Sequence, residues 1–258
     1  MRPTGPIRAV LLDLDDTLIV EETTAMAHLR ATADLAGADP DGWEDRVLEA
    51  ARAEWYSSEH HSVCQELGIA SWEALWATFE GAHPKIAALG AYAPSYASRT
   101  WTRVLEDAGL DTSLAPDLSG LYVDLQRAGH PPAPGADQLV SRATAIGPVG
   151  LVTNGPPDIQ RWKLAQTPHA SRFAAVVISG EVGIGKPDPE IFLHALQRLE
   201  VEPRDSVMVG DSWERDVEGA LSAGLRAVWI SYGRPQPRSD PDIVVANGPG
   251  DVDFTAWS

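Results

Sequence analysis

The chain has 258 residues, a formal net charge of −17 and 44% hydrophobic residues, which predicts a globular protein longer than one typical domain and shorter than two. The excess of acidic residues argues against nucleic-acid binding, which needs lysine and arginine to neutralise phosphate, and against docking on an anionic membrane surface. The single cysteine excludes an intrachain disulfide, and because neither a signal peptide nor a transmembrane segment can be recognised, we expect a cytoplasmic protein.

The first predicted element is a buried strand over Ala9–Leu14 that ends in acidic residues. Asp13, Asp15 and Asp16 fall at its end, where unpaired carboxylates would be costly to bury unless a cation neutralised them. Mg²⁺ suits this place because it prefers oxygen ligands, usually one or two carboxylates completed by water and substrate phosphate. Ligand sites in open α/β sheets also lie at the carboxyl ends of the strands. The pattern therefore predicts a Mg²⁺-assisted enzyme with Asp13 or Asp15 at its centre.

The next part of the chain, from about residue 20 to about residue 130, is predicted to be helical because it is rich in alanine and contains no convincing strand. Helical apolar spacing occurs in four places: Met26–Leu35, Val47–Tyr56, Trp72–Phe79 and Trp101–Leu105. Five of the nine tryptophans fall here, and we expect them to fill a small helical core, with one or two free to face a substrate. The proline-rich stretch Pro131–Gly135 is typical of a stiff linker. We therefore predict a core of residues 1–19 and 131–258 with residues 20–130 inserted.

The rest of the chain alternates between apolar runs and helical patterns. The predicted strands are Val149–Thr153, Ala174–Ser179, Ser206–Asp211 and Arg226–Ile230, with Ile243–Ala246 as a possible edge strand. The predicted helices are Asp158–Gln166, Pro189–Leu199 and Glu214–Ala223. Nearly continuous apolar runs are typical of parallel strands that are covered on both faces. The alternation therefore predicts an α/β fold, with a doubly wound, Rossmann-like parallel sheet and an inserted α-helical cap.

Polar groups of complementary chemistry follow four of these strands. They are the acidic run that begins at Asp13, the hydroxyl and backbone amides of Thr153-Asn154-Gly155, the loop that contains Lys186, and the acids Asp211 and Asp216. Because the carboxyl ends of parallel strands meet at one edge of a sheet, we expect these groups to converge. Together they would supply a nucleophile, an acid, donors for a phosphoryl oxygen, a cation and a metal ligand. That combination is what phosphoryl transfer requires.

The four segments, in this order, resemble the motifs of the haloacid dehalogenase (HAD) superfamily. The chain carries D-L-D-D-T-L at Asp13–Leu18, a hydrophobic strand that ends in Thr153, a lysine at 186, and G-D-S-x-x-x-D at Gly210–Asp216. The helical insertion after the first motif resembles the C1-type cap of subclass I. The motif forms are similar to the branch that contains N-acylneuraminate-9-phosphatase-like and pyrimidine 5′-nucleotidase-like hydrolases. The resemblance covers most of the chain.

The resemblance implies roles for the first motif. Asp13 would be the nucleophile that forms an aspartyl-phosphate, and Asp15 would be the general acid that protonates the leaving oxygen and later activates water. Thr17 would support the geometry of the turn. The implied cofactor is Mg²⁺, held by Asp13, the backbone carbonyl of Asp15 and Asp211.

The resemblance also implies roles for the later motifs. Thr153 and Asn154 would bind the phosphoryl group, through a hydroxyl and a backbone N–H respectively. Lys186 would offset the negative charge on the nucleophile and on the phosphoryl group. Asp211 would ligate the metal, and Asp216 would support the metal site or occasionally bind the ion directly.

Lysine is scarce in this chain, whereas arginine is common. The only lysines are Lys85, Lys163 and Lys186. A lysine in such a background is somewhat more often retained for a specific role.

The reaction is indicated by the acid two residues after the nucleophile. An alkoxide leaving group needs a proton, whereas a halide does not, so Asp15 favours phosphate-ester chemistry. Asp16 departs from the glycine of the D-x-D-G-T form in sugar-phosphate mutases. We therefore expect a Mg²⁺-dependent phosphatase that acts on a small phosphorylated metabolite. A phosphomutase, a 2-haloacid dehalogenase and a non-catalytic binding protein remain alternatives, and neither the substrate nor the oligomeric state can be derived.

Overall fold

The protein is built around one six-stranded sheet, seen in a computed structural model that describes residues 5–257. The strand order is β3-β2-β1-β4-β5-β6, and every neighbouring pair is parallel. The strands are β1 (Ala9–Leu12), β2 (Val149–Thr153), β3 (Ala175–Ile178), β4 (Ser206–Gly210), β5 (Arg226–Ile230) and β6 (Ile243–Ala246). The predicted doubly wound parallel sheet is confirmed, including the sixth strand at its edge.

The central strand β1 shows why these sequences are almost wholly apolar. Leu12 pairs with Leu151 of β2 and with Val209 of β4, so the strand has neighbours on both sides. Successive side chains point to opposite faces, and both faces are buried: Val10 and Leu12 join one hydrophobic cluster, while Ala9 and Leu11 join another. A strand covered on both faces has no position where a polar side chain would reach water.

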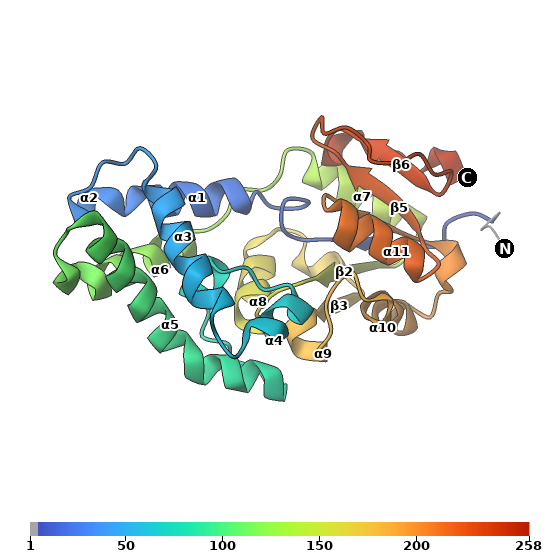
Figure 1. Cartoon of the computed structure of the whole chain (residues 1–258). Helices are drawn as coiled ribbons and strands as arrows, with labels where there is room; N and C mark the ends of the chain where they lie inside the picture. The colour runs from blue at the N-terminus through green and yellow to red at the C-terminus, as the bar shows by residue number, and fades with distance from the viewer. Residues whose placement is uncertain (1–4, 258) are drawn as a thin grey trace.

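Helices cover the two faces of the sheet (Figure 1). On one face, α7 (Ala136–Ile146) packs against the cluster that contains Leu12; on the other, α10 (Pro189–Leu199) and α11 (Gly219–Ser222) pack against the cluster that contains Leu11. The remaining elements of this part are α8 (Pro157–Gln166), α9 (Ser179–Val182), η3 (Ala170–Arg172), η4 (Pro203–Asp205), η5 (Trp213–Glu218), η6 (Pro249–Asp251) and η7 (Thr255–Trp257).

Between β1 and β2 the chain forms a run of helices, here called the helical segment. Its elements are α1 (Glu22–Ala31), α2 (Ala33–Ala36), α3 (Trp43–Tyr56), α4 (His61–Leu67), η1 (Glu73–Leu75), α5 (Pro84–Ala108), η2 (Thr112–Leu114) and α6 (Ala115–Arg127). Figure 1 shows these helices gathered on one side of the sheet. Trp43, Trp55, Trp76 and Trp101 are buried in their shared hydrophobic cluster, while Trp72 is only half-buried at its margin. No described helix has both the length and the hydropathy needed to cross a bilayer.

The helical segment leaves and rejoins the rest of the chain at neighbouring points. Val20 donates its N–H to the carbonyl of Pro131 at 2.8 Å, and Ala133 donates to the carbonyl of Leu18 at 2.9 Å. The two connections therefore run side by side, which places the helical segment above the carboxyl end of β1.

One predicted helix is wrong. Trp72–Phe79 contains only the short 3₁₀ turn η1, after which the backbone has no regular secondary structure. Thr78 donates its N–H to a carboxylate oxygen of Asp158 at 2.7 Å rather than to a preceding carbonyl, and Phe79 has a positive φ of 55°. This contact with α8 outweighs the local helical spacing.

The predicted helix Glu214–Ala223 is present but begins irregularly. Its first part, η5, is a π-helical turn, and α11 follows at Gly219. Ser212 precedes it: its hydroxyl accepts a hydrogen bond from the N–H of Arg215 at 3.3 Å, and its own N–H donates to Asp216 at 2.9 Å. π-Helical turns are rare and are frequently found at functional sites.

Candidate active site

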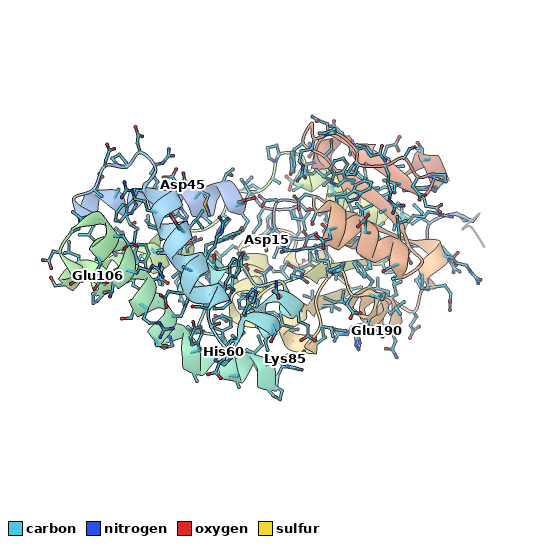
Figure 2. All side chains as sticks on the ribbon, viewed as in Figure 1. Asp15, Asp45, His60, Lys85, Glu106 and Glu190 are labelled. Atoms are coloured by element: carbon cyan, nitrogen blue, oxygen red, sulfur yellow. The ribbon has the colours of Figure 1, made fainter. Side chains whose placement is uncertain are left out.

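A cavity of about 270 Å³ opens between the carboxyl edge of the sheet and the helical segment. From the sheet side it is lined by Asp13, Asp15, Asp16, Thr153, Asn154, Lys186, Asp211 and Asp216. From the helical segment and its approach it is lined by Glu21, Glu22, Gly68, Ala70, Trp72 and Glu73. Figure 2 labels Asp15 where these two parts meet. The structure therefore brings the four predicted strand-end groups to one cavity, and Trp72 is the tryptophan that lines it from the helical segment.

Lys186 lies at the bottom of this cavity, between two carboxylates. Its Nζ donates to Oδ1 of Asp13 and to Oδ1 of Asp216, both at 2.6 Å, and its side chain is 2% exposed. Burial raises the pKa of Asp13 well above its ordinary value, and the neighbouring acids add to this, although Lys186 opposes it. Burial also lowers the pKa of Lys186, but the charges of Asp13 and Asp216 outweigh it and leave that pKa raised.

Asn154 holds the backbone of Lys186 in place. Its Nδ2 donates to the carbonyl of Lys186 at 2.9 Å, and its Oδ1 accepts the N–H of Lys186 at 2.7 Å. This pair of bonds joins the end of β2 to the loop before α10. The side chain of Asn154 is thus engaged with protein, which leaves its backbone as the part that could face a phosphoryl group.

Three carboxylates form a group that could hold a metal ion. Oxygens of Asp13, Asp211 and Asp216 all lie within 4.8 Å of one another. Burial raises the pKa of Asp211 to about 7, and the charge of Asp216 adds to the rise. Lys186 and Arg234, whose guanidinium lies 3.4 Å from Asp211, do not together balance three acids, so the arrangement fits a divalent cation, which prefers such oxygen ligands. The side chain of Asp15 lies outside this group, so only its backbone carbonyl is left for the predicted metal role.

The turn after Asp15 is fixed mainly by Asp16 and by backbone bonds. Asp16 adopts a positive φ of 53°, its Oδ1 accepts the N–H of Glu21 at 2.9 Å, and its carbonyl accepts the hydroxyl of Tyr232 at 2.8 Å. Thr17 donates its N–H to the carbonyl of Leu14 at 3.3 Å. The buried hydroxyl of Thr17 finds no hydrogen-bond partner among residues 5–257, so it adds no hydrogen bond to the turn.

Asp15 is held by two side chains of α8. Gln160 donates to its Oδ2 at 2.8 Å, and Lys163 donates to its Oδ1 at 3.0 Å. The same Nε2 of Gln160 also lies 2.6 Å from the hydroxyl oxygen of Thr153. Asp15 and Thr153 are therefore linked through one amide group.

Lys163 is the centre of a second buried ionic cluster. Its side chain is 0% exposed, and its Nζ lies 3.0 Å from Asp15, 3.4 Å from Glu21 and 3.2 Å from Glu73. Burial raises the pKa of Glu21 to about 8 and raises that of Glu73, despite the opposing charge of Lys163. The charges of these three acids raise the pKa of Lys163, although burial alone would lower it.

Four of these residues were not predicted from the sequence: Gln160, Lys163, Glu21 and Glu73. Gln160 and Lys163 are three residues apart on a helix that starts just after Thr153-Asn154-Gly155, so they share a face near the site. That spacing, with the scarcity of lysine, is the signal that could have identified the first two. Nothing local distinguishes Glu21 and Glu73, because they join the cluster only through tertiary packing.

At the carboxyl edge of a Rossmann-like sheet, a buried lysine bonds two carboxylates and a group of acids lies beside it. This arrangement is typical of α/β enzymes, and comparison with known families agrees. The chain belongs to the haloacid dehalogenase-like hydrolase family, whose model matches residues 7–224. The resemblance expected from the motifs is therefore confirmed.

Individual relatives are named as phosphatases. The chain is 38% identical to the phosphoserine phosphatase of Thermus thermophilus, over 93% of its own length and 96% of that protein. It is 30% identical to the N-acylneuraminate-9-phosphatase of Mus musculus, over 91% of its length and 87% of the relative. Its fold is similar to the crystal structure of a HAD phosphatase from Thermococcus onnurineus, with a TM-score of 0.58 and 25% identity over 93% of each chain.

Proposed function

We propose that this chain is a Mg²⁺-dependent phosphatase that hydrolyses a small phosphomonoester. The observation that carries the proposal is Lys186, whose ammonium bonds both Asp13 and Asp216 in the cavity that Asp15, Thr153 and Asp211 also line. A carboxylate held next to a permanent cation can approach a phosphate dianion without prohibitive repulsion. The relatives named as phosphatases support the same reaction class.

In the proposed reaction Asp13 is the nucleophile. One of its carboxylate oxygens forms a bond to phosphorus while the bond from phosphorus to the ester oxygen breaks. The proton that the departing oxygen needs comes from the Asp15 carboxyl group, and Lys186 offsets the charge gathered at the attacked phosphorus. Asp15 then takes a proton from water as that water attacks the acyl-phosphate, which releases inorganic phosphate and restores Asp13.

The residues that would hold Mg²⁺ are Asp13, Asp211 and Asp216, together with the carbonyl of Asp15. When bound, the ion would neutralise phosphoryl oxygens and orient the group for in-line attack. Thr153 would hold a phosphoryl oxygen by its hydroxyl, and Asn154 by its backbone N–H. We further propose that residues 20–130 act as a cap over this site and select the substrate, since Trp72 and Glu73 face the cavity from above.

The decisive test replaces the nucleophile. We expect Asp13→Asn to reduce phosphate release by at least about 10⁴-fold, because the acyl-phosphate can no longer form. The assay is a phosphate-release screen across sugar phosphates, nucleoside monophosphates and phosphorylated acids, with phosphoserine among them. EDTA should stop the wild-type reaction, and added Mg²⁺ should restore it.

The matched control is Asp107→Asn, the same change at a carboxylate that is 71% exposed on α5. Its turnover should equal that of the wild type. Full activity in the Asp13 variant, or turnover that survives EDTA, would refute the assignment. Halide release from a haloacid would indicate a dehalogenase instead, and an isomerised sugar phosphate without free phosphate would indicate a mutase.

A further inference from the structure

The proposed reaction leaves Lys163 without a role, although its side chain is completely buried. Three carboxylates surround its ammonium at 3.0 to 3.4 Å, and its side chain has no contact with solvent. A buried lysine carries a large desolvation cost, so its retention needs compensation by good geometry. The position of its partners indicates what that geometry achieves.

The first partner is Asp15, the proposed general acid. Both oxygens of the Asp15 carboxylate are engaged, Oδ1 by Lys163 and Oδ2 by Gln160. Two contacts on different oxygens fix the plane of a carboxylate, whereas one contact leaves it free to rotate. Both donors lie on α8, which begins directly after the segment that would bind the phosphoryl group, so one rigid helix sets the acid relative to the phosphate.

The second partner is Glu73, which belongs to η1 of the helical segment. Its Oε1 accepts from Lys163 at 3.2 Å, and its Oε2 accepts the N–H of Ala70 at 3.0 Å. Glu21 completes the cluster and also accepts the indole N–H of Trp72 at 3.2 Å. The lysine is therefore shared between the acid at the sheet edge and the turn that lies over the cavity.

We propose that Lys163 is a positioning residue for Asp15 and that Glu73 links this positioning to the seating of the helical segment. The inference rests on the proposed phosphatase function and adds a residue to it. Proton transfer to the leaving oxygen then depends on the contact between the sheet edge and η1. An ion pair that merely fastened the helical segment to the sheet would affect stability without favouring one leaving group over another.

Leaving-group chemistry separates these two roles. Protonation by Asp15 matters most for a strongly basic leaving oxygen and least for a weakly basic one. The ratio kcat/KM reports only the steps through formation of the aspartyl-phosphate, so slower hydrolysis of that intermediate does not obscure the comparison. Phenyl, 4-nitrophenyl and 2,4-dinitrophenyl phosphate share one shape class and differ mainly in the basicity of the phenol they release.

The experiment measures kcat/KM for this series with the full-length wild type and with Lys163→Met. We expect the variant to lose about 100-fold on phenyl phosphate and less than about 5-fold on 2,4-dinitrophenyl phosphate, in line with the general-acid contribution. Glu73→Gln, which keeps the size of the side chain, should lose about 10-fold on phenyl phosphate with the same selectivity.

Two further variants protect the result against a folding effect. The double variant Lys163→Met with Glu73→Gln removes one charge of each sign, so it should fold better than Lys163→Met while keeping the selective loss. The matched control is Lys85→Met, since Lys85 also joins the helical segment to the rest of the protein, donating to the carbonyl of Gly183 at 2.8 Å, but lies outside the cavity. Figure 2 shows it well away from Asp15.

Each outcome bears on a different claim. A selective loss in Lys163→Met, or in the double variant where the single one does not fold, supports the positioning role. An equal loss across the three phosphates, or no loss, overturns it while leaving the phosphatase proposal intact. A wild type that hydrolyses none of the three and none of the screened phosphates overturns the phosphatase proposal itself.

Discussion

Two buried lysines organise this cavity in different ways. Lys186 bonds two acids that belong to the sheet edge, Asp13 and Asp216. Lys163 instead joins an acid of the sheet edge to Glu73 of the helical segment. The first centre is complete within the sheet-bearing part of the chain, whereas the second takes one of its acids, Glu73, from the helical segment. The Lys186 centre therefore carries the proposed chemistry, whereas the Lys163 centre carries the proposed positioning of Asp15.

The two centres also balance their charge differently. Around Lys186 the acids Asp13, Asp211 and Asp216 remain in excess even with Arg234 counted, which fits a divalent cation. Around Lys163 the excess of acid is reduced by a proton on Glu21, because burial raises the pKa of that group to about 8. A metal ion would serve phosphoryl transfer, whereas a protonated glutamic acid serves packing and hydrogen bonding.

The largest effect is expected from removing the first centre. Lys186→Met leaves Asp13 and Asp216 without their shared cation, so we expect turnover to fall by about 10³-fold. We also expect a loss of about 3 kcal/mol in the free energy of unfolding without Mg²⁺, the cost of breaking a buried pair. Phosphate release and urea denaturation measure the two quantities.

The same Lys186 variant also tests whether the two lysines act on different steps. If Lys186→Met showed the leaving-group selectivity expected for Lys163→Met, the two lysines would act on the same step. The distinction between a chemical centre and a positioning centre would then be wrong.

The sequence predicted the first centre far better than the second. Asp13 and Lys186 follow strands or their loops, and parallel strands bring such positions to one edge whatever the details of packing. Glu73 falls within the predicted helix Trp72–Phe79. That helix does not continue beyond η1, because Thr78 bonds Asp158, and the chain turns over the cavity. Strand periodicity is a local property, whereas the seating of the helical segment is set by contacts between distant residues.

A smaller effect is expected where Asp216 is displaced rather than removed. A methyl group at Gly210 would lie 2.2 Å from Oδ2 of Asp216, so Gly210→Ala must shift that carboxylate. If Asp216 supports the metal group, the Mg²⁺ concentration for half-maximal activity should rise about 10- to 100-fold. Calorimetric titration with Mg²⁺ should show the same weakening.

Gly120→Ala provides the matched control for this change. A methyl group at Gly120 of α6 meets nothing within 4 Å. The substitution should leave the Mg²⁺ dependence unchanged and slightly stabilise the helix. Equal Mg²⁺ affinity in both variants would exclude Asp216 from the metal group and leave Lys186 as its main contact.

The smallest effect concerns pH and the second centre. Burial raises the pKa of Glu21 to about 8 in the folded state from an ordinary value of 4.5. Between these values the folded protein keeps a proton that the unfolded chain has lost. The free energy of unfolding therefore falls as pH rises through this window, by at most about 1.4 kcal/mol per pH unit for one proton. Below pH 6.5 the lowered pKa values of His28 and His130 act in the opposite direction, so the clean window is 6.5 to 8.

Glu21→Gln should therefore flatten this dependence. Asp211, whose pKa is also raised, contributes a slope of the same sign in both proteins, so the difference between wild type and variant isolates Glu21. The measurement is urea denaturation at several pH values from 6.5 to 8 without Mg²⁺, with Glu22→Gln as control because that neighbouring side chain is exposed. Parallel curves for wild type and Glu21→Gln would mean that Glu21 is already ionised beside Lys163. The second centre would then hold its acids in ionised form, and the two centres would not differ in how they balance charge.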